Sequence, residues 1–99
     1  MLATIICYDL ASAGLSDRAR TRLDRELYGW TDRSNNGRYT YERDGLLHRV
    51  SHLRPVRSVL VVASDRAGTV IGLLERYGAQ VFAREVVLAS EDEGKLGGG

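Results

Sequence analysis

Several residue types that define common protein classes are scarce in this 99-residue chain. It has one cysteine, one proline and one tryptophan. The single Cys7 excludes an internal disulfide and a C-x-x-C metal pair, and within an apolar segment it acts as a small hydrophobic residue. No apolar run approaches the roughly 18 residues of a membrane helix, and no basic region precedes the first run. We therefore expect a cytoplasmic protein without membrane association.

Sequence patterns of several catalytic classes are also missing. The chain has no Ser-His-Asp arrangement, no phosphate-cradling glycine loop and no dinucleotide fingerprint. We therefore expect no organic cofactor. Lysine is nearly lacking as well, because 13 of the 14 basic residues are arginine, although the net charge is only +1. Guanidinium groups suit phosphate and carboxylate recognition, so a polyanionic partner is compatible with this composition.

Apolar periodicity and turn residues divide the chain into strands and helices. The run of β-formers that contains "TIICYDL" predicts a first strand, and Ser16 is a suitable N-cap for a helix with apolar residues at helical spacing. Asp44-Gly45 is a two-residue turn signal between β-like segments, which predicts a hairpin. The predicted elements are a strand at residues 2–10, a helix at 17–28, a hairpin at 38–50, a strand ending before Asp65, a helix at 66–77 and a strand at 79–88.

This order of elements predicts one α+β domain over residues 1–88. Its two halves are alike, which is typical of a ferredoxin-like βαββαβ fold with an antiparallel sheet and both helices on one face. The charged, glycine-rich residues 89–99 are expected to be a flexible acidic tail. We further expect the strands that precede the two helices to be adjacent and parallel, so that Asp9 and Asp65 emerge at the same end of the sheet.

Two acidic residues at one end of a sheet allow two interpretations. Asp9 and Asp65 could lie close enough to bind a divalent cation such as Mg²⁺ or Mn²⁺, which could assist phosphodiester cleavage. Alternatively, each carboxylate has a structural role: aspartate favours turns at the ends of strands, and Asp65 is placed to cap the second helix. The sequence leaves both interpretations open.

Arginine and tyrosine form the remaining candidate surfaces. Those in the predicted first helix and hairpin are candidates for contacts with a nucleic-acid backbone, or else a solvated surface paired with nearby acids. Tyr39 and Tyr41 alternate in the predicted hairpin, where they could stack on bases or form a dimer interface; we favour the interface. The candidate nucleic-acid-binding residues are Arg18, Arg20, Arg22, Arg25, Arg38 and Arg43.

The first strand ending in "YDL", the arginine-rich helix ending in "LYGW" and the predicted element order resemble the CRISPR-associated second core protein family. That family contains small, dimeric, ferredoxin-like endoribonuclease-type subunits of the spacer-acquisition complex. The resemblance implies a metal-dependent catalytic role for Asp9, close to its symmetry mate across a homodimer. It also implies binding to duplex DNA through the backbone, a role that needs no cleavage. The segment "NNGRYTYERDGLLHRV" and the tail depart from the family pattern.

These observations predict a homodimeric protein that binds RNA or duplex DNA. It acts either as a weak metal-dependent endonuclease with Asp9 as the catalytic residue, or as a structural subunit of a DNA-processing complex. The alternative is a non-catalytic assembly or regulatory module, which uses the sheet and the tyrosine hairpin to bind itself or another protein.

Overall fold

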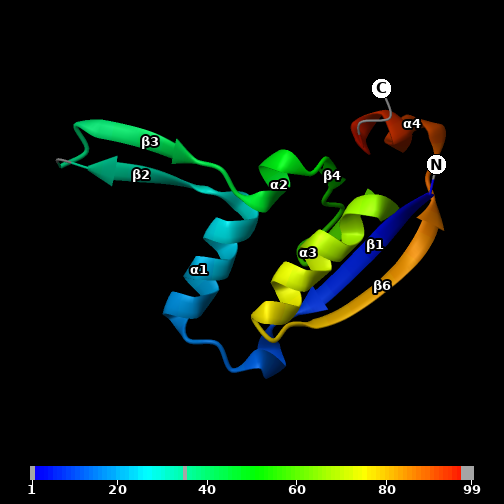
Figure 1. Ribbon diagram of the computed structural model, residues 1–99, viewed down its shortest axis with the longest axis horizontal. Helices are drawn as coiled ribbons and strands as arrows, with labels where there is room; N and C mark the ends of the chain where they lie inside the picture. Colours follow the sequence, from blue (N-terminus) through cyan, green and yellow to red (C-terminus); the bar gives the residue numbers. More distant parts are fainter. Residues whose placement is uncertain (1, 35, 97–99) are drawn as a thin grey trace.

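The computed structural model describes residues 2–34 and 36–96. It has a four-stranded antiparallel sheet, a helix along one face of that sheet, and a two-stranded arm that extends to one side (Figure 1). No helix in these residues is long and apolar enough to cross a membrane. The elements are β1 (Leu2–Asp9), η1 (Ala11–Ala13), α1 (Asp17–Tyr28), β2 (Trp30–Ser34), β3 (Tyr39–Arg43), α2 (Leu46–Arg49), β4 (His52–Leu53), β5 (Val59–Ala63), α3 (Ser64–Arg76), β6 (Gln80–Val87), α4 (Ser90–Glu93) and η2 (Gly94–Leu96).

The sheet confirms the expected α+β class but differs from the prediction in its details. Its strands lie in the order β4-β5-β1-β6, and all three neighbouring pairs are antiparallel. The prediction that the two strands before the helices run parallel is therefore wrong: Ala3 of β1 is opposite Ala63 of β5, and Cys7 is opposite Val59. The chain also contains more elements than βαββαβ, because β2 and β3 form a separate sheet.

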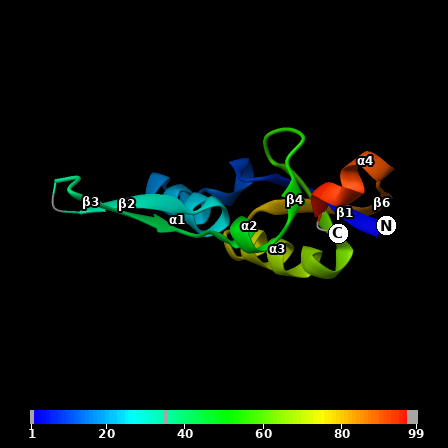
Figure 2. The same ribbon diagram turned by 90° about the horizontal axis from the view of Figure 1, so that it is seen from above.

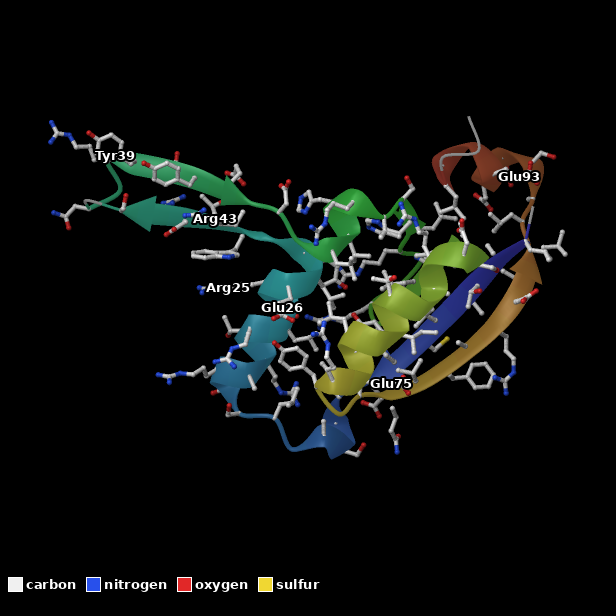
Figure 3. All side chains as sticks on the ribbon, viewed as in Figure 1. Arg25, Glu26, Tyr39, Arg43, Glu75 and Glu93 are labelled. Atoms are coloured by element: carbon white, nitrogen blue, oxygen red, sulfur yellow. The ribbon has the colours of Figure 1, made fainter. Side chains whose placement is uncertain are left out.

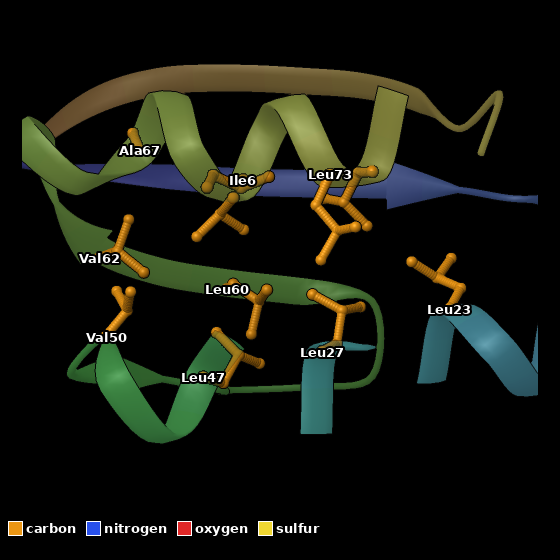
Figure 4. Close-up of a cluster of buried hydrophobic side chains, with 11 residues drawn as sticks. Ile6, Leu23, Leu27, Leu47, Val50, Leu60, Val62, Ala67 and Leu73 are labelled. Carbon is orange, nitrogen blue, oxygen red and sulfur yellow. The ribbon is translucent and has the colours of Figure 1, made fainter. Parts of the chain in front are cut away.

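One face of the sheet carries the main hydrophobic core (Figure 4). Side chains at alternate positions of β1 and β5 point to this face, where α3 lies along the sheet and α1 and α2 close the core from the side (Figure 2). Burial of each such aliphatic side chain contributes about 1.5–3 kcal/mol. The buried members of this cluster are Ile6, Leu23, Leu27, Leu47, Val50, Leu60, Val62, Ala67, Val70, Leu73 and Leu74.

The opposite face of the sheet is only partly covered. Ala3 and Val61 are buried there together with Leu96, which lies in the short helical segment after β6. Residues 90–96 thus form α4 and η2 and pack onto the sheet, whereas the sequence predicted a flexible tail from residue 89; residues 97–99 lie outside the described part. Further along the same face, Phe82 is 53% exposed.

The first helix agrees with its prediction at both ends. The Ser16 hydroxyl accepts a hydrogen bond from the Ala19 amide at 3.1 Å, and α1 spans Asp17–Tyr28. The second predicted helix is observed as α3, two residues earlier at its start. Asp65 lies in the first turn of α3, but no side chain caps this helix, so the predicted capping hydrogen bond of Asp65 is not formed. Ser64 instead shares a 2.9 Å hydrogen bond with the buried Thr4.

The hairpin is displaced from its predicted position. The turn lies near Asn36 and Gly37, which both have positive φ values, of 58° and 82°. The strands on either side are β2 and β3, and the predicted turn at Asp44-Gly45 is instead the approach to α2. We call the pair β2 and β3 the arm. It pairs only with itself and forms one end of the 47 Å long axis (Figure 1).

Two glycines allow the arm to join the body. Gly29, with φ of 75°, follows α1, and Gly45 precedes α2. A Cβ atom on Gly29 would overlap the carbonyl oxygen of Arg43, and a Cβ atom on Gly45 would overlap the backbone of Leu27 and Gly29. The chain therefore crosses itself here at backbone contact distance, which only glycine permits.

Candidate functional site

A polar cleft of about 670 Å³ opens at the end of the sheet where β1 finishes. Three segments form its walls: the end of β1 with the following residues, one side of α1, and the loop between β4 and β5. The charged side chains that line it are Asp9, Arg20, Asp24, Arg25, Arg54 and Arg57. Four guanidinium groups and two carboxylates leave a net positive charge, so the cleft is better suited to an anion than to a free cation.

Two tyrosines line this cleft and contact each other. The hydroxyl groups of Tyr8 and Tyr28 are 3.0 Å apart, and the Arg54 guanidinium lies 4.5 Å from the centre of the Tyr28 ring. Burial, followed by the hydrogen bond with Tyr8, raises the pKa of Tyr28 above its ordinary value. Tyr28 therefore remains a neutral phenol near neutral pH, able to donate a hydrogen bond but unsuited to act as a base.

Asp9 occupies the rim of the cleft and is exposed to solvent. Its Oδ1 atom accepts a hydrogen bond from the Ala11 amide at 2.9 Å, which is the turn geometry that aspartate favours after a strand. The structural role proposed for Asp9 is thus present. One carboxylate oxygen makes this bond, and the other has no hydrogen-bond partner within the described residues. The side chain can fix the turn and contact a ligand at the same time.

Asp9 and Asp65 do not form a shared site within one chain. Because β1 and β5 are antiparallel, Asp9 ends β1 near Val59, whereas Asp65 follows the other end of β5, beside Ala3. The two residues therefore lie at opposite ends of the sheet. No group of three or more histidine, cysteine, aspartate or glutamate side chains suited to a metal ion occurs in residues 2–34 and 36–96.

The predicted arginines of α1 divide between two surfaces. Arg20 lines the cleft, whereas Arg18 and Arg22 line a second, shallower hollow beside the base of the arm. Arg25 contributes to both and places its guanidinium 4.1 Å from the centre of the Trp30 ring (Figure 3). Arginine side chains thus continue from the cleft around α1 to the arm, with Glu26 and Asp44 also lining the second hollow.

The remaining predicted residues lie on the arm. Arg38 is exposed next to the turn, and Tyr39 and Tyr41 are 50% and 51% exposed on β3. Arg43 forms an ion pair of 3.2 Å with Asp32 on the neighbouring strand. Tyr39 lies at the far end of the arm, away from the cleft (Figure 3). The interface role of the two tyrosines stays a prediction.

Sequence reasoning missed the arginines of the opposite wall. Arg54 and Arg57 lie in the loop between β4 and β5, and both are exposed. The signal available was the segment "LRPVRS", two arginines around the single proline, which reads as an ordinary connection. In the described part of the chain, the guanidinium groups of Arg20 and Arg57 have no ion-pair or hydrogen-bond partner. Their guanidinium groups are thus available to a ligand.

Comparison of the chain with models of known protein families, with curated proteins and with solved structures finds no match in any of the three. The resemblance to the CRISPR-associated second core protein family therefore stays a prediction from the sequence.

Proposed function

We propose that this protein binds nucleic acid, with the arginine-lined cleft and the adjoining surface of α1 contacting the phosphate backbone. The observation that carries the proposal is the convergence of Arg20, Arg54 and Arg57 from α1 and from the β4–β5 loop on one cleft. A guanidinium group can form two parallel hydrogen bonds to a phosphate, so such a cluster suits phosphate groups. The net charge of the whole chain is only +1, so attraction of a nucleic acid depends on this local cluster of arginines and not on the overall charge of the protein.

We further infer that the body is a ferredoxin-like unit interrupted by the arm. If β2, β3 and α2 are treated as an insertion, the remaining elements follow the order strand, helix, strand, strand, helix, strand. The sheet order β4-β5-β1-β6 supports this interpretation, because each strand pair is antiparallel and β1 lies in the interior of the sheet. The inferred insertion accounts for the long polar segment after α1, where the sequence departs from the resembled family.

A salt titration tests the binding proposal. Fluorescently labelled RNA and duplex DNA are titrated with the purified protein at several salt concentrations, and the observed association constant is measured by anisotropy. Contacts to phosphates release counterions, so the logarithm of this constant falls by about 0.9 per phosphate contact on duplex DNA for each tenfold rise in salt. Affinity that is independent of salt, or no binding to either polymer at low salt, contradicts the proposal.

Asp9 supports a second candidate function, phosphodiester cleavage assisted by Mg²⁺ or Mn²⁺. The supporting observation is an exposed carboxylate with one unpaired oxygen on the rim of the arginine-lined cleft. The residues of one chain fit a resident cation poorly, since the cleft is net positive and Asp65 is remote. Mg²⁺ is commonly held by one or two carboxylates together with substrate phosphates, so Asp9 would contact a cation that arrives with the phosphate.

Replacing Asp9 by asparagine separates catalysis from structure. The amide oxygen of asparagine can still accept the hydrogen bond from Ala11, so the turn is retained while the charge is lost. We expect Asp9→Asn to abolish metal-dependent cleavage of RNA or DNA and to preserve binding. The matched control is Asp65→Asn at the other end of the sheet, which should cleave like the wild type. Equal cleavage by Asp9→Asn, or no cleavage by the wild type with either metal, eliminates the catalytic candidate.

A homodimer remains part of the proposal and has a candidate surface. Asp9, Cys7 and Phe82 point to the partly covered face of the sheet, because Cys7 is opposite Phe82 in the register. Phe82 is 53% exposed there, with the Arg84 guanidinium 4.0 Å from the centre of its ring, and it offers an apolar contact that a second copy could cover. Packing two copies through this face would bring the two Asp9 residues toward each other. The rival assembly module would use the same face without nucleic acid.

A further inference from the structure

The arm has two unlike faces. Residues that are opposite each other in an antiparallel pair point to the same face, so the register places Trp30, Tyr39 and Tyr41 together on one side. Arg43 lies among them, opposite Trp30. The other face carries short polar and charged side chains and no aromatic ring; its members are Thr31, Arg33, Thr40 and Glu42.

We propose that the aromatic face of the arm binds single-stranded nucleic acid by stacking one base on each exposed tyrosine ring. The inference rests on the proposed function and deepens it, because it names the form of nucleic acid that the protein engages. Tyr39 and Tyr41 are 50% and 51% exposed, and Tyr39 lies at the far end of the arm (Figure 3). Aromatic rings on an exposed strand are a common platform for unpaired bases.

The spacing of the rings favours an unpaired strand. Tyr39 and Tyr41 are two residues apart on one strand, hence about 6.8 Å along it. Bases within a duplex strand are about 3.4 Å apart, stacked on each other and paired. Each base of a strand lying on the arm must therefore separate from its neighbour to reach its own ring. A duplex cannot do this without melting, whereas a flexible single strand can.

The charges around the rings suit a polyanion. Arg43 lies 5.7 Å from the centre of the Tyr41 ring, and Arg25 lies 4.1 Å from that of Trp30. Arg38 is exposed beside Tyr39. The single carboxylate on the aromatic face, Asp32, is already paired with Arg43.

The aromatic face is also continuous with the arginine surface of α1. The hollow that contains Arg18 and Arg22 reaches Trp30 at the base of the arm, and because Arg25, Glu26 and Asp44 also line it, its net charge is weakly positive. A strand whose bases lie on the arm can thus continue with its phosphates along α1. This continuity favours a nucleic acid over a second copy of the chain, because a second arm would bring its own arginines against the same basic surface.

The single tryptophan provides a direct test. Trp30 is on the same face as the tyrosines and is diagonal to Tyr41, so a strand stacked along this face should quench its fluorescence. Short oligothymidylate and oligouridylate are titrated in parallel, which separates DNA from RNA, and a duplex of the same length is compared. We expect Tyr39→Ala with Tyr41→Ala to lower affinity for single strands by about thirtyfold or more and to leave duplex affinity unchanged.

Two matched variants and one further measurement make the outcome unambiguous. Tyr39→Phe with Tyr41→Phe keeps the rings and should bind like the wild type, as should Thr31→Ala with Thr40→Ala on the other face. If the double alanine variant binds single strands normally while variants of the cleft do not, the arm inference is wrong and the proposed function stands. If the wild type binds no nucleic acid, both fail. If the double alanine variant instead lowers the molar mass measured by light scattering, the tyrosines form an interface between copies and the inference is overturned.

Discussion

Gly45→Ala is expected to lower the free energy of unfolding by about 3 kcal/mol or more. A Cβ atom at residue 45 would overlap the backbone of Leu27 and Gly29, and backbone cannot move aside as a side chain can. The end of α1 and the start of α2 would have to separate, which opens the core at Leu27 and Leu47. For a domain of this size, we expect a drop of roughly 10–20 °C in Tm, measured by circular dichroism.

Gly72→Ala is the matched control for this prediction. Gly72 lies inside α3 and has open space where a Cβ atom would be. Alanine is favoured over glycine within a helix, so this variant should gain roughly 0.5–1 kcal/mol. The fluorescence of Trp30, next to Gly29, should follow the same unfolding transition in both variants. A Gly45→Ala protein as stable as the wild type would show that the two backbone segments are not in contact.

Replacing Arg20, Arg54 and Arg57 together by alanine is expected to weaken nucleic-acid binding by roughly a hundredfold or more. Each guanidinium is exposed, so its loss should cost little stability, whereas each lost hydrogen bond to a phosphate costs about 1.5 kcal/mol or more. The plot of the logarithm of the association constant against the logarithm of the salt concentration should also become less steep, by about one unit of slope for each phosphate contact removed. Anisotropy titrations over a range of salt measure both quantities.

A second triple variant controls for the change in net charge. Arg49, Arg66 and Arg76 lie on α2 and α3, outside the cleft, and their replacement by alanine removes the same charge. For this variant, the association constant should depend on salt almost as it does for the wild type, because only basic groups that contact phosphates release counterions. Equal losses in the two variants would mean that binding depends on overall charge and not on the cleft.

Local signals in the sequence predicted the two long helices and the strands β1, β5 and β6 well. The limits of α1 follow from the Ser16 cap and Gly29, and both act within a few residues of the positions that they define. The direction of β1 relative to β5 could not be derived in this way. It depends on where the intervening residues leave and rejoin the sheet, and the mistaken parallel pairing is what placed Asp9 and Asp65 together.

The hairpin prediction failed because two turn signals compete in one segment. Asn36-Gly37 and Asp44-Gly45 are both strong two-residue turn patterns, and the sequence alone does not rank them. The position of α2 decides between them: Leu47 and Val50 must reach the core, so the residues after Gly45 become helix and connection. The apolar pattern of such a short helix is indistinguishable from that of a strand.

The candidate cleft illustrates what spacing along a sequence cannot reveal. Asp9 and Arg20 belong to segments that sequence reasoning had selected, but Arg54 and Arg57 reach the cleft only through the tertiary fold. The α1 arginines face two directions, which follows from helical geometry once the buried side at Leu23 and Leu27 is known. The sequence therefore predicted residues on one wall of the cleft, whereas the arginines on the other wall became known only from the structure.

The crossing of the chain at Gly29 and Gly45 has an evolutionary consequence. The excursion through β2 and β3 leaves the body and returns to it at nearly the same point, so its two ends are already joined in space. Such a segment can be lengthened, shortened or exchanged by genetic change without altering the path of the surrounding domain. The arm can thus diverge as one detachable module while the scaffold of the body stays constant.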